Sequence, residues 1–174
     1  NDIRYSFLQL MLSALGLPQQ YHHFKFVYWA KQEGIYDGLK AIVTNAGKNF
    51  EKELENMFVS STLANALLQI KPEFAENEAK VKDAFRAQFK RLESIDRHQL
   101  ITTIKDEVLP MFYGNHIPCT IIVLDEIQQF IGVDGNKTID IQNLAQEICD
   151  NFNGKLLLIG SGQNALNDTP QLQP

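Results

Sequence analysis

Two adjacent carboxylates follow a run of apolar residues in the second half of the chain. Asp125 and Glu126 come directly after residues 119–124 (CTIIVL), which we expect to form a strand buried on both faces. A parallel strand that ends in an acidic pair delivers both carboxylates to the carboxyl edge of a sheet, where open α/β folds bind their ligands. There Asp125 offers oxygen ligands to Mg²⁺, and Glu126 offers a base that polarises an attacking water molecule.

A second apolar run, residues 155–159, is also expected to be a strand, and it ends in the sequence Gly-Ser-Gly-Gln. Between the two runs, residues 138–153 place apolar side chains at spacings of three and four, which predicts an amphipathic helix. Gly154 stands where helices commonly end. A strand–helix–strand unit with two continuous apolar runs is typical of a right-handed, parallel connection.

Both strands of such a unit end at the same edge of the sheet, so the polar residues that follow them meet. We therefore expect Gln163, or as second choice Ser161, to lie beside Asp125 and Glu126. This is the layout of the Walker B and sensor 1 elements of ATPases with a catalytic glutamate, in which the sensor side chain contacts the γ-phosphate or the attacking water. The simpler alternative is a strand that ends in a solvated acidic turn, beside a flexible Gly-Ser-Gly turn.

The same region resembles a known family. Residues 120–132 (TIIVLDEIQQFIG), 154–166 (GKLLLIGSGQNAL) and 169–172 (TPQL) resemble the very large, AAA-like P-loop ATPases of bacterial BREX and phage-growth-limitation defence systems. Residues 28–31 (YWAK) and 34–37 (GIYD) are similar in character to the helical part of that family. The resemblance implies a hydrolase that uses ATP and Mg²⁺ inside a multi-protein phage-defence complex, with other defence-system proteins and further subunits of an oligomer as partners.

The fold expected from these patterns is helix-rich α/β, a partial P-loop NTPase core with at least two parallel strands and a large helical insertion. Residues 1–112 are expected to form the helical insertion or subdomain. Residues 113–168 are expected to contain the Walker B strand, the helix and the sensor 1 strand, and residues 169–174 a disordered tail. Helices are predicted over residues 3–15, 20–32, 35–45, 50–57, 60–70, 73–92 and 97–109, the last one ended by Pro110.

The sequence contains no phosphate-binding loop of the form G-x-x-x-x-G-K-[ST]. Gly47-Lys48 is the nearest approach, but position 42 is Ile, position 49 is Asn, and no strand leads into it. Because that loop provides the backbone N–H groups and the lysine that hold the phosphates, we expect this chain alone to be inactive and to bind ATP weakly or not at all. We expect it to be an internal piece of a longer protein, with the loop upstream and the rest of that protein as its first partner.

Composition limits the classes of partner and compartment. The net charge of −5 and the apolar content of 44% are typical of an ordinary globular chain without a broad nucleic-acid-binding surface. They do not exclude a local basic patch. No apolar run approaches the roughly 20 residues of a membrane span, and no signal peptide opens the chain. Cys119 and Cys149 are expected to be small core residues in a reducing compartment, which favours the cytoplasm.

Two further predictions concern partners in trans. A basic face of the helix expected at residues 73–92 contains Arg86 and Arg91, which are candidate arginine fingers or, as the simpler alternative, members of a solvated helix face. The free edge of the strand at residues 155–159 is expected to pair with a second chain or to be covered by a helix.

Two functions other than the AAA-like ATPase remain open. In a helicase-like motor, the sequence Asp-Glu-Ile-Gln at residues 125–128 would act as the acidic box, and Gln128 would couple the nucleotide to motion. In a helical protein–protein interaction module without catalysis of its own, the helices would bind a partner and the acidic pair would be incidental.

Overall fold

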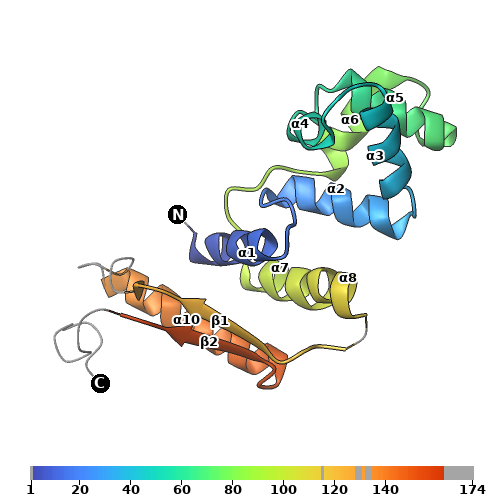
Figure 1. Cartoon of the computed structure of the whole chain (residues 1–174). Helices are drawn as coiled ribbons and strands as arrows, with labels where there is room; N and C mark the ends of the chain where they lie inside the picture. Colours follow the sequence, from blue (N-terminus) through green and yellow to red (C-terminus); the bar gives the residue numbers. More distant parts are fainter. Residues whose placement is uncertain (1, 115, 128–130, 132–134, 163–174) are drawn as a thin grey trace. The chain divides into compact units, whose positions relative to one another are not determined.

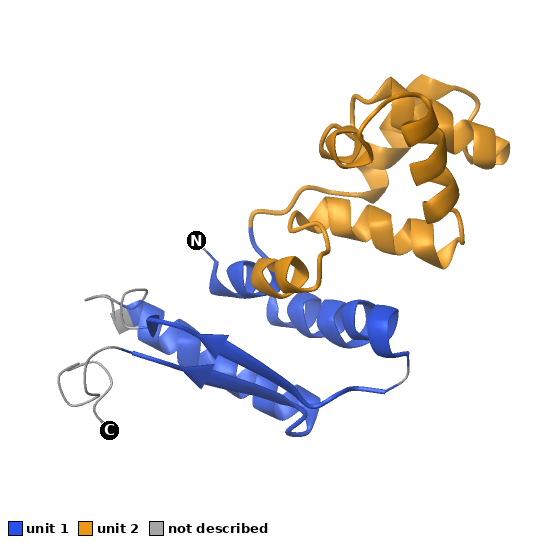
Figure 2. Ribbon diagram, viewed as in Figure 1, with its two compact units in different colours: residues 1–8, 94–174 blue, residues 9–93 orange. Residues whose placement is uncertain are grey.

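The chain folds into two compact units (Figure 2). Unit 1 combines residues 1–8 with residues 94–174, and unit 2 is the continuous stretch 9–93. Residues 94–112, expected to belong to the helical subdomain, group with the strands in unit 1. The structure is a computed structural model, and the residues that it describes are 2–114, 116–127, 131 and 135–162.

The first half of the chain is helical, as the periodicity of its apolar residues predicts (Figure 1). The aromatic-rich stretch that begins at Tyr21 is a helix as well. The elements are α1 (Ile3–Ala14), α2 (Tyr21–Gln32), α3 (Tyr36–Asn45), α4 (Phe50–Glu55), α5 (Ser61–Ile70), the 3₁₀ helix η1 (Pro72–Phe74) and α6 (Glu78–Gln88).

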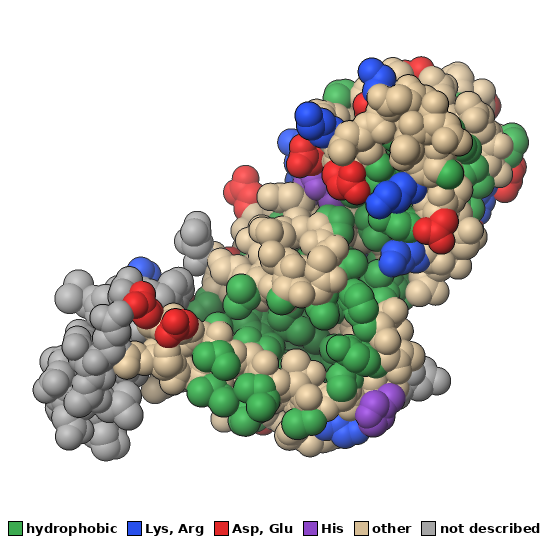
Figure 3. Space-filling model, viewed as in Figure 1, with side chains coloured by type: hydrophobic (Ala, Val, Ile, Leu, Met, Phe, Trp, Pro, Cys, Tyr) green, Lys and Arg blue, Asp and Glu red, His purple; other side chains and the backbone are tan. Residues whose placement is uncertain are grey.

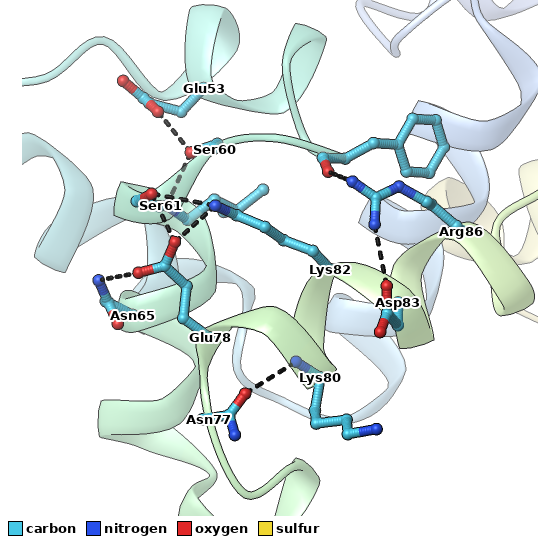
Figure 4. Close-up of polar contacts among 12 residues, drawn as sticks. Glu53, Ser60, Ser61, Asn65, Asn77, Glu78, Lys80, Lys82, Asp83 and Arg86 are labelled. Atoms are coloured by element: carbon cyan, nitrogen blue, oxygen red, sulfur yellow. Dashed lines mark hydrogen bonds and ion pairs between the residues drawn. The ribbon is translucent and has the colours of Figure 1, made fainter.

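Side-chain caps fix the starts of α4, α5 and α6. In each case the residue before the helix accepts a hydrogen bond from the backbone N–H three positions later, which satisfies one of the unpaired donors of the first turn. Two of these caps, at Ser60 and Asn77, are visible in Figure 4. The donors and acceptors are Lys52 N to Asn49 Oδ1 at 2.8 Å, Leu63 N to Ser60 Oγ at 2.9 Å and Lys80 N to Asn77 Oδ1 at 3.1 Å.

The prediction of one long helix over residues 73–92 is wrong at both ends. A 3₁₀ turn follows Pro72, the chain is extended at Asn77, and α6 runs only from Glu78 to Gln88. The side chain of Asn77 accepts a hydrogen bond from a backbone N–H of the first turn. Asn77 is therefore the cap of α6 and not a residue in the interior of a helix.

Aromatic rings form the centre of unit 2. Phe85 on α6 is fully buried, and its ring lies 5.2 Å from Phe26 on α2, nearly perpendicular to it. Phe89 adds a second edge-on contact to Phe26 at 5.5 Å, and Trp29 lies 5.8 Å from Phe89. Edge-to-face pairs at these distances contribute energy beyond the area that they bury. The rings therefore join α2 to α6, which lie about sixty residues apart in the chain.

The second segment of unit 1, from residue 94 on, begins with a helix that changes its winding. Asp96 and Gln99 form a capping box at the start of α7 (Arg97–Thr102), a π-helical stretch η2 (Thr103–Val108) follows, and α8 (Leu109–Tyr113) continues it. The prediction that Pro110 ends the helix is wrong. Pro110 lies in the first turn of α8, where a missing N–H is tolerated, and the wider π turn before it absorbs the change in hydrogen bonding.

The described residues that follow α8 in unit 1 contain a strand–helix–strand unit. β1 (Thr120–Leu124) and β2 (Leu156–Gly160) pair in parallel, with Thr120 opposite Leu156 and Leu124 opposite Gly160. Helix α10 (Gly135–Phe152) connects them and includes all but the last residue of the predicted helix. The prediction of a parallel pair is confirmed, and the fold is helix-rich α/β with a two-stranded parallel sheet.

The prediction that the strands are buried on both faces is wrong. Side chains alternate along each strand, and the outward set is 59% exposed at Ile121, 57% at Val123, 51% at Leu157 and 41% at Ile159. Figure 3 shows apolar side chains over this pair of strands. The strands are exposed because only one layer of helix packs on the sheet. Helix α10 covers one face, and its residues Leu144, Ile148 and Phe152 are buried there. No other described element covers the opposite face.

The start of the chain is tied to the end of unit 1. Arg4 donates from Nε and Nη2 to the carboxylate of Glu147 on α10, at 2.6–3.2 Å. Glu147 is 5% exposed, so this fork-shaped pair neutralises a buried charge. Asp2 adds a second tie, because its Oδ2 accepts a hydrogen bond from Ile95 N at 2.9 Å.

Candidate functional site

The pairing of β1 and β2 continues past the ends of both strands. Ser161 N donates to Leu124 O at 2.9 Å, and Ile127 N donates to Ser161 O at 3.0 Å. Residue 125 therefore lies opposite residue 161, at the carboxyl edge of the sheet. This is the position that the sequence pattern predicts for the two polar groups.

The side chains of Asp125 and Ser161 are in contact. Ser161 Oγ donates a short hydrogen bond to Asp125 Oδ1. The same carboxylate oxygen accepts a hydrogen bond from Glu126 N at 3.0 Å, and Glu126 N also lies 3.4 Å from Ser161 Oγ. Two donors thus fix Oδ1, and within the described residues no hydrogen bond engages Oδ2.

Glu126 adopts a backbone conformation that non-glycine residues seldom use. Its φ is +52°, in the left-handed region, which costs an L-residue roughly 1–2 kcal/mol. Such conformations persist where the surrounding structure holds them, and they cluster at functional sites. Here the hydrogen bond from Glu126 N to Asp125 holds the turn, and the carboxylate of Glu126 is presented directly after the strand, half-buried at the edge of the sheet.

Three of the four predicted site residues are therefore brought together: Asp125, Glu126 and Ser161. Gln163, the first choice for the sensor, lies outside the described residues, as do Gln128 and the tail expected at residues 169–174. Ser161, the second choice, is the one whose contact with Asp125 is visible.

The oxygen atoms of Asp125 and Ser161 suit a metal ion that takes its remaining ligands from a bound small molecule and from water. No group of three or more His, Cys, Asp or Glu side chains capable of holding a metal ion occurs in the described stretches. Mg²⁺ in nucleotide sites is commonly bound by one or two carboxylates together with phosphate oxygens and water. Asp125 with the adjacent Ser161 hydroxyl fits that second pattern and not a cage built from protein alone.

The candidate arginine fingers are engaged inside unit 2. Arg86 donates to Phe58 O at 2.7 Å and pairs with Asp83 at 3.0 Å (Figure 4). Arg91 lies over the ring of Phe58, with Cζ 5.1 Å from its centroid. Lys82, on the same helix, pairs with Glu78. These contacts favour the simpler interpretation, a helix surface laced by local polar contacts.

The cysteines are not core residues. Cys119 and Cys149 are both exposed free thiols, so the prediction that they fill the core is wrong. Cys119 precedes β1, and Cys149 lies on α10 beside the inward-facing Ile148. Helix α10 has one inward face only, and the predicted apolar stripe extends past its edge.

Two neighbouring histidines on α2 are buried, which the sequence pattern does not reveal. His22 is 5% exposed and His23 is 8% exposed, with ring centroids 4.1 Å apart. His22 stacks on Phe58 at 5.4 Å. Neither His22 Nδ1 nor His23 Nε2 has a hydrogen-bond partner among the described residues. A His-His pair on an aromatic helix was the only signal, and it does not distinguish a surface pair from a buried one.

We expect unit 2 to lose stability as the pH falls below about 6.5. Burial, the charge of His23 and the charge of Arg91 lower the pKa of His22 to about 4, and burial also lowers the pKa of His23. The folded state therefore favours neutral rings. The contribution of these rings to the free energy of unfolding is fully present above the pKa of the unfolded state and is lost as the pH falls toward 4. The free energy of unfolding should fall by roughly 1–3 kcal/mol.

Urea unfolding between pH 7.5 and 4.5 measures this effect. A His22→Phe variant should show a shallower pH dependence, because one of the two buried titrations is gone. His98→Phe is the matched control, since His98 is exposed and should leave the slope unchanged. Equal slopes for wild type and His22→Phe would contradict the assignment.

No described helix is both long enough and apolar enough to cross a membrane. The chain matches no protein-family model, no curated protein and no solved structure. Inferences about its function therefore depend on the residues at the strand edge and on their contacts.

Proposed function

We propose that this chain forms the Walker B and sensor 1 part of an AAA-like P-loop ATPase site that binds and hydrolyses ATP with Mg²⁺. The observation that carries the proposal is the hydrogen bond from Ser161 to Asp125 across the carboxyl ends of two parallel strands. Glu126, held in a left-handed turn beside this pair, supports it. An acidic turn that is only solvated requires neither the hydrogen bond between the two strands nor the left-handed conformation of Glu126.

Each side chain has a separate task in this proposal. Asp125, fixed through Oδ1 by Ser161 and by Glu126 N, directs Oδ2 to the cation. Glu126 accepts a proton from the water that attacks the γ-phosphate. Ser161 keeps the Asp125 carboxylate in one orientation, so that little reorganisation is needed during the reaction. Mg²⁺ would neutralise charge on the transferring phosphoryl group.

The phosphate-binding loop completes this site and belongs, in our proposal, to a longer protein that contains these residues. The resemblance to the ATPases of bacterial phage-defence systems supplies the class of parent protein, in which other defence-system proteins are the partners. Cytoplasmic location is part of the same proposal.

Replacement of Asp125 tests the metal-binding role. In a protein that joins these residues to the phosphate-binding loop, Asp125→Asn should weaken the affinity for Mg-ATP about 10- to 100-fold. The affinity for ATP in EDTA should not change, because the lost group contacts the metal and not the base or the phosphates. Calorimetric titration of both ligands makes the comparison.

Asp150→Asn is the matched control for this test, since Asp150 on α10 is exposed and contacts surface side chains, Arg97 at 3.5 Å and Gln146 Nε2 at 2.7 Å. It should bind both ligands like the wild type. Mg-ATP binding that is indifferent to Asp125→Asn would remove the proposal.

A second candidate function is a non-catalytic interaction module, and one observation favours it. The outward face of the strand pair presents Ile121, Val123, Leu157 and Ile159 to solvent, and contiguous exposed apolar surface often marks a contact with another protein. The Asp125→Asn titration separates the two candidates, because an interaction module has no need of that carboxylate.

A further inference from the structure

The acidic turn after β1 is one residue longer than the pairing with β2 requires. Ser161 N donates a hydrogen bond to Leu124 O at 2.9 Å, and Ser161 O accepts one from Ile127 N at 3.0 Å. In a regular parallel ladder, a single residue separates the two positions that bond to the same neighbour. Here Asp125 and Glu126 both lie between those positions. Two residues therefore stand opposite Ser161, as in a β-bulge.

The extra residue is Glu126, and the bulge determines where its side chain is presented. Successive side chains of a regular strand point to opposite faces of the sheet, so a regular strand would separate the two carboxylates. The left-handed conformation of Glu126, with a φ of +52°, interrupts this alternation at the end of the strand. Bulges commonly redirect a side chain in this way. The position of the Glu126 carboxylate therefore depends on the contacts that hold the bulge.

Ile127 holds the bulge through its backbone and through its side chain. Its N–H bonds to Ser161 O, and its side chain lies against Gly160 of β2. A Cβ at position 160 would lie 3.4 Å from Ile127 Cδ1, 3.5 Å from Cγ2 and 4.0 Å from Cβ. These are ordinary van der Waals distances, so alanine fits at position 160. The additional methyl groups of a larger residue would need space that Ile127 fills.

We propose that Ile127 is a positioning residue, whose contact with Gly160 fixes the carboxylate of Glu126 for catalysis. This inference rests on the proposed ATPase function, in which Glu126 accepts the proton of the attacking water. Asp125 and Ser161 are joined by their own hydrogen bond, so the Ile127–Gly160 contact governs Glu126 more than it governs the metal-binding carboxylate. Loss of the contact should therefore slow the chemical step and leave the binding of Mg-ATP nearly unchanged.

Three variants change this contact in graded steps. Gly160→Ala adds only the Cβ that fits, so it should behave like the wild type. Gly160→Val adds two methyl groups that compete with Ile127 for space, so it should open the bulge. The double variant Gly160→Val, Ile127→Ala removes the competing side chain and should restore the bulge in large part. Ile159→Ala, at the neighbouring exposed position of β2, is the matched control and should behave like the wild type.

NMR spectroscopy of the 174-residue chain measures the bulge itself, without ATP. A residue with positive φ gives a strong cross-peak between its own amide and α protons, and the Ile127 amide exchanges slowly while it donates to Ser161 O. In Gly160→Val the Glu126 cross-peak should weaken, and the Ile127 amide should exchange about tenfold faster. The double variant should regain most of both signals. If Gly160→Val does not fold, Ile127→Ala alone, which adds no bulk, should show the same faster exchange.

Turnover measures the consequence for the chemical step. In a protein that joins these residues to the phosphate-binding loop, Gly160→Val should lower kcat roughly 10- to 100-fold, because small displacements of a catalytic group are costly. KM and the affinity for Mg-ATP should stay nearly unchanged, and the double variant should recover most of the turnover. A wild type without ATP hydrolysis would refute the proposed function and with it the catalytic role of Ile127, even if the NMR signals change as expected.

Three results would overturn the inference while the ATPase assignment stands. The first is wild-type turnover with wild-type NMR signals in Gly160→Val. The second is a parallel loss of kcat and of Mg-ATP affinity, which would show that the Ile127–Gly160 contact supports the whole site and not Glu126 in particular. The third is a double variant as slow as Gly160→Val, which would show that the effect of the added methyl groups does not pass through Ile127.

Discussion

A Glu126→Gln variant is expected to hydrolyse ATP roughly 10²–10⁴-fold more slowly than the wild type, in a protein that joins these residues to the phosphate-binding loop. Glutamine has nearly the same shape as glutamate but cannot accept the proton of the attacking water. Asp125 and Ser161 remain in place, so Mg-ATP should still bind with nearly unchanged affinity. A coupled assay of ADP release measures the turnover, and calorimetry measures the binding.

Two controls make the result specific. Glu93→Gln removes an exposed carboxylate at the end of unit 2 and should hydrolyse ATP at the wild-type rate. A variant in which the turn itself is changed, Glu126→Gly, removes the same carboxylate but also relieves the positive φ of +52°. It should be as slow as Glu126→Gln and no less stable than the wild type. Equal turnover of Glu126→Gln and wild type would exclude Glu126 as the base.

Phe85→Ala is expected to destabilise unit 2 by about 3–5 kcal/mol, which is the usual cost of removing a buried aromatic ring. Phe85 is fully buried, and its ring meets Phe26 at 5.2 Å, Phe89 at 6.0 Å and Phe74 at 6.1 Å. Its removal leaves a cavity at the junction of α2 and α6. Such a cost is a large part of the stability of a small domain.

Denaturant unfolding followed by tryptophan fluorescence measures this effect in unit 2 alone. Trp29 is the single tryptophan of the chain, and its ring lies 5.6 Å from Phe74 and 5.8 Å from Phe89. Phe112→Ala is the matched control, because Phe112 in unit 1 is 44% exposed. It should leave the midpoint of this transition within experimental error. A loss below 1 kcal/mol for Phe85→Ala would show that the aromatic cluster is not the core.

The sequence predicts what depends on neighbours along the chain. Helix positions in unit 2 follow from the spacing of apolar residues, and the parallel pairing of β1 with β2 follows from two apolar runs on either side of a helix. The meeting of Asp125 with Ser161 follows in turn, because parallel strands end at one edge of the sheet.

What the sequence mispredicts depends on groups that are distant along the chain or on details of the backbone. An apolar run such as residues 120–124 is the same whether one layer or two covers the sheet, so the exposure of Ile121 and Val123 has no local signal. Asn77 and Pro110 are each compatible with more than one local structure. In the folded chain Asn77 caps the start of α6, and the helix continues through Pro110. The burial of His22 and His23 depends on residues that are distant along the chain, such as Phe58.

The contacts of Arg4 with Glu147 and of Asp2 with Ile95 set an order of events during synthesis on the ribosome. Unit 2 is contiguous, so all of its residues have emerged once residue 93 is free, and domains generally fold as they emerge. Arg4 must wait for more than fifty further residues before its carboxylate partner exists. Because a folded unit 2 replaces a long flexible loop, it lowers the entropic cost of bringing the two segments of unit 1 together.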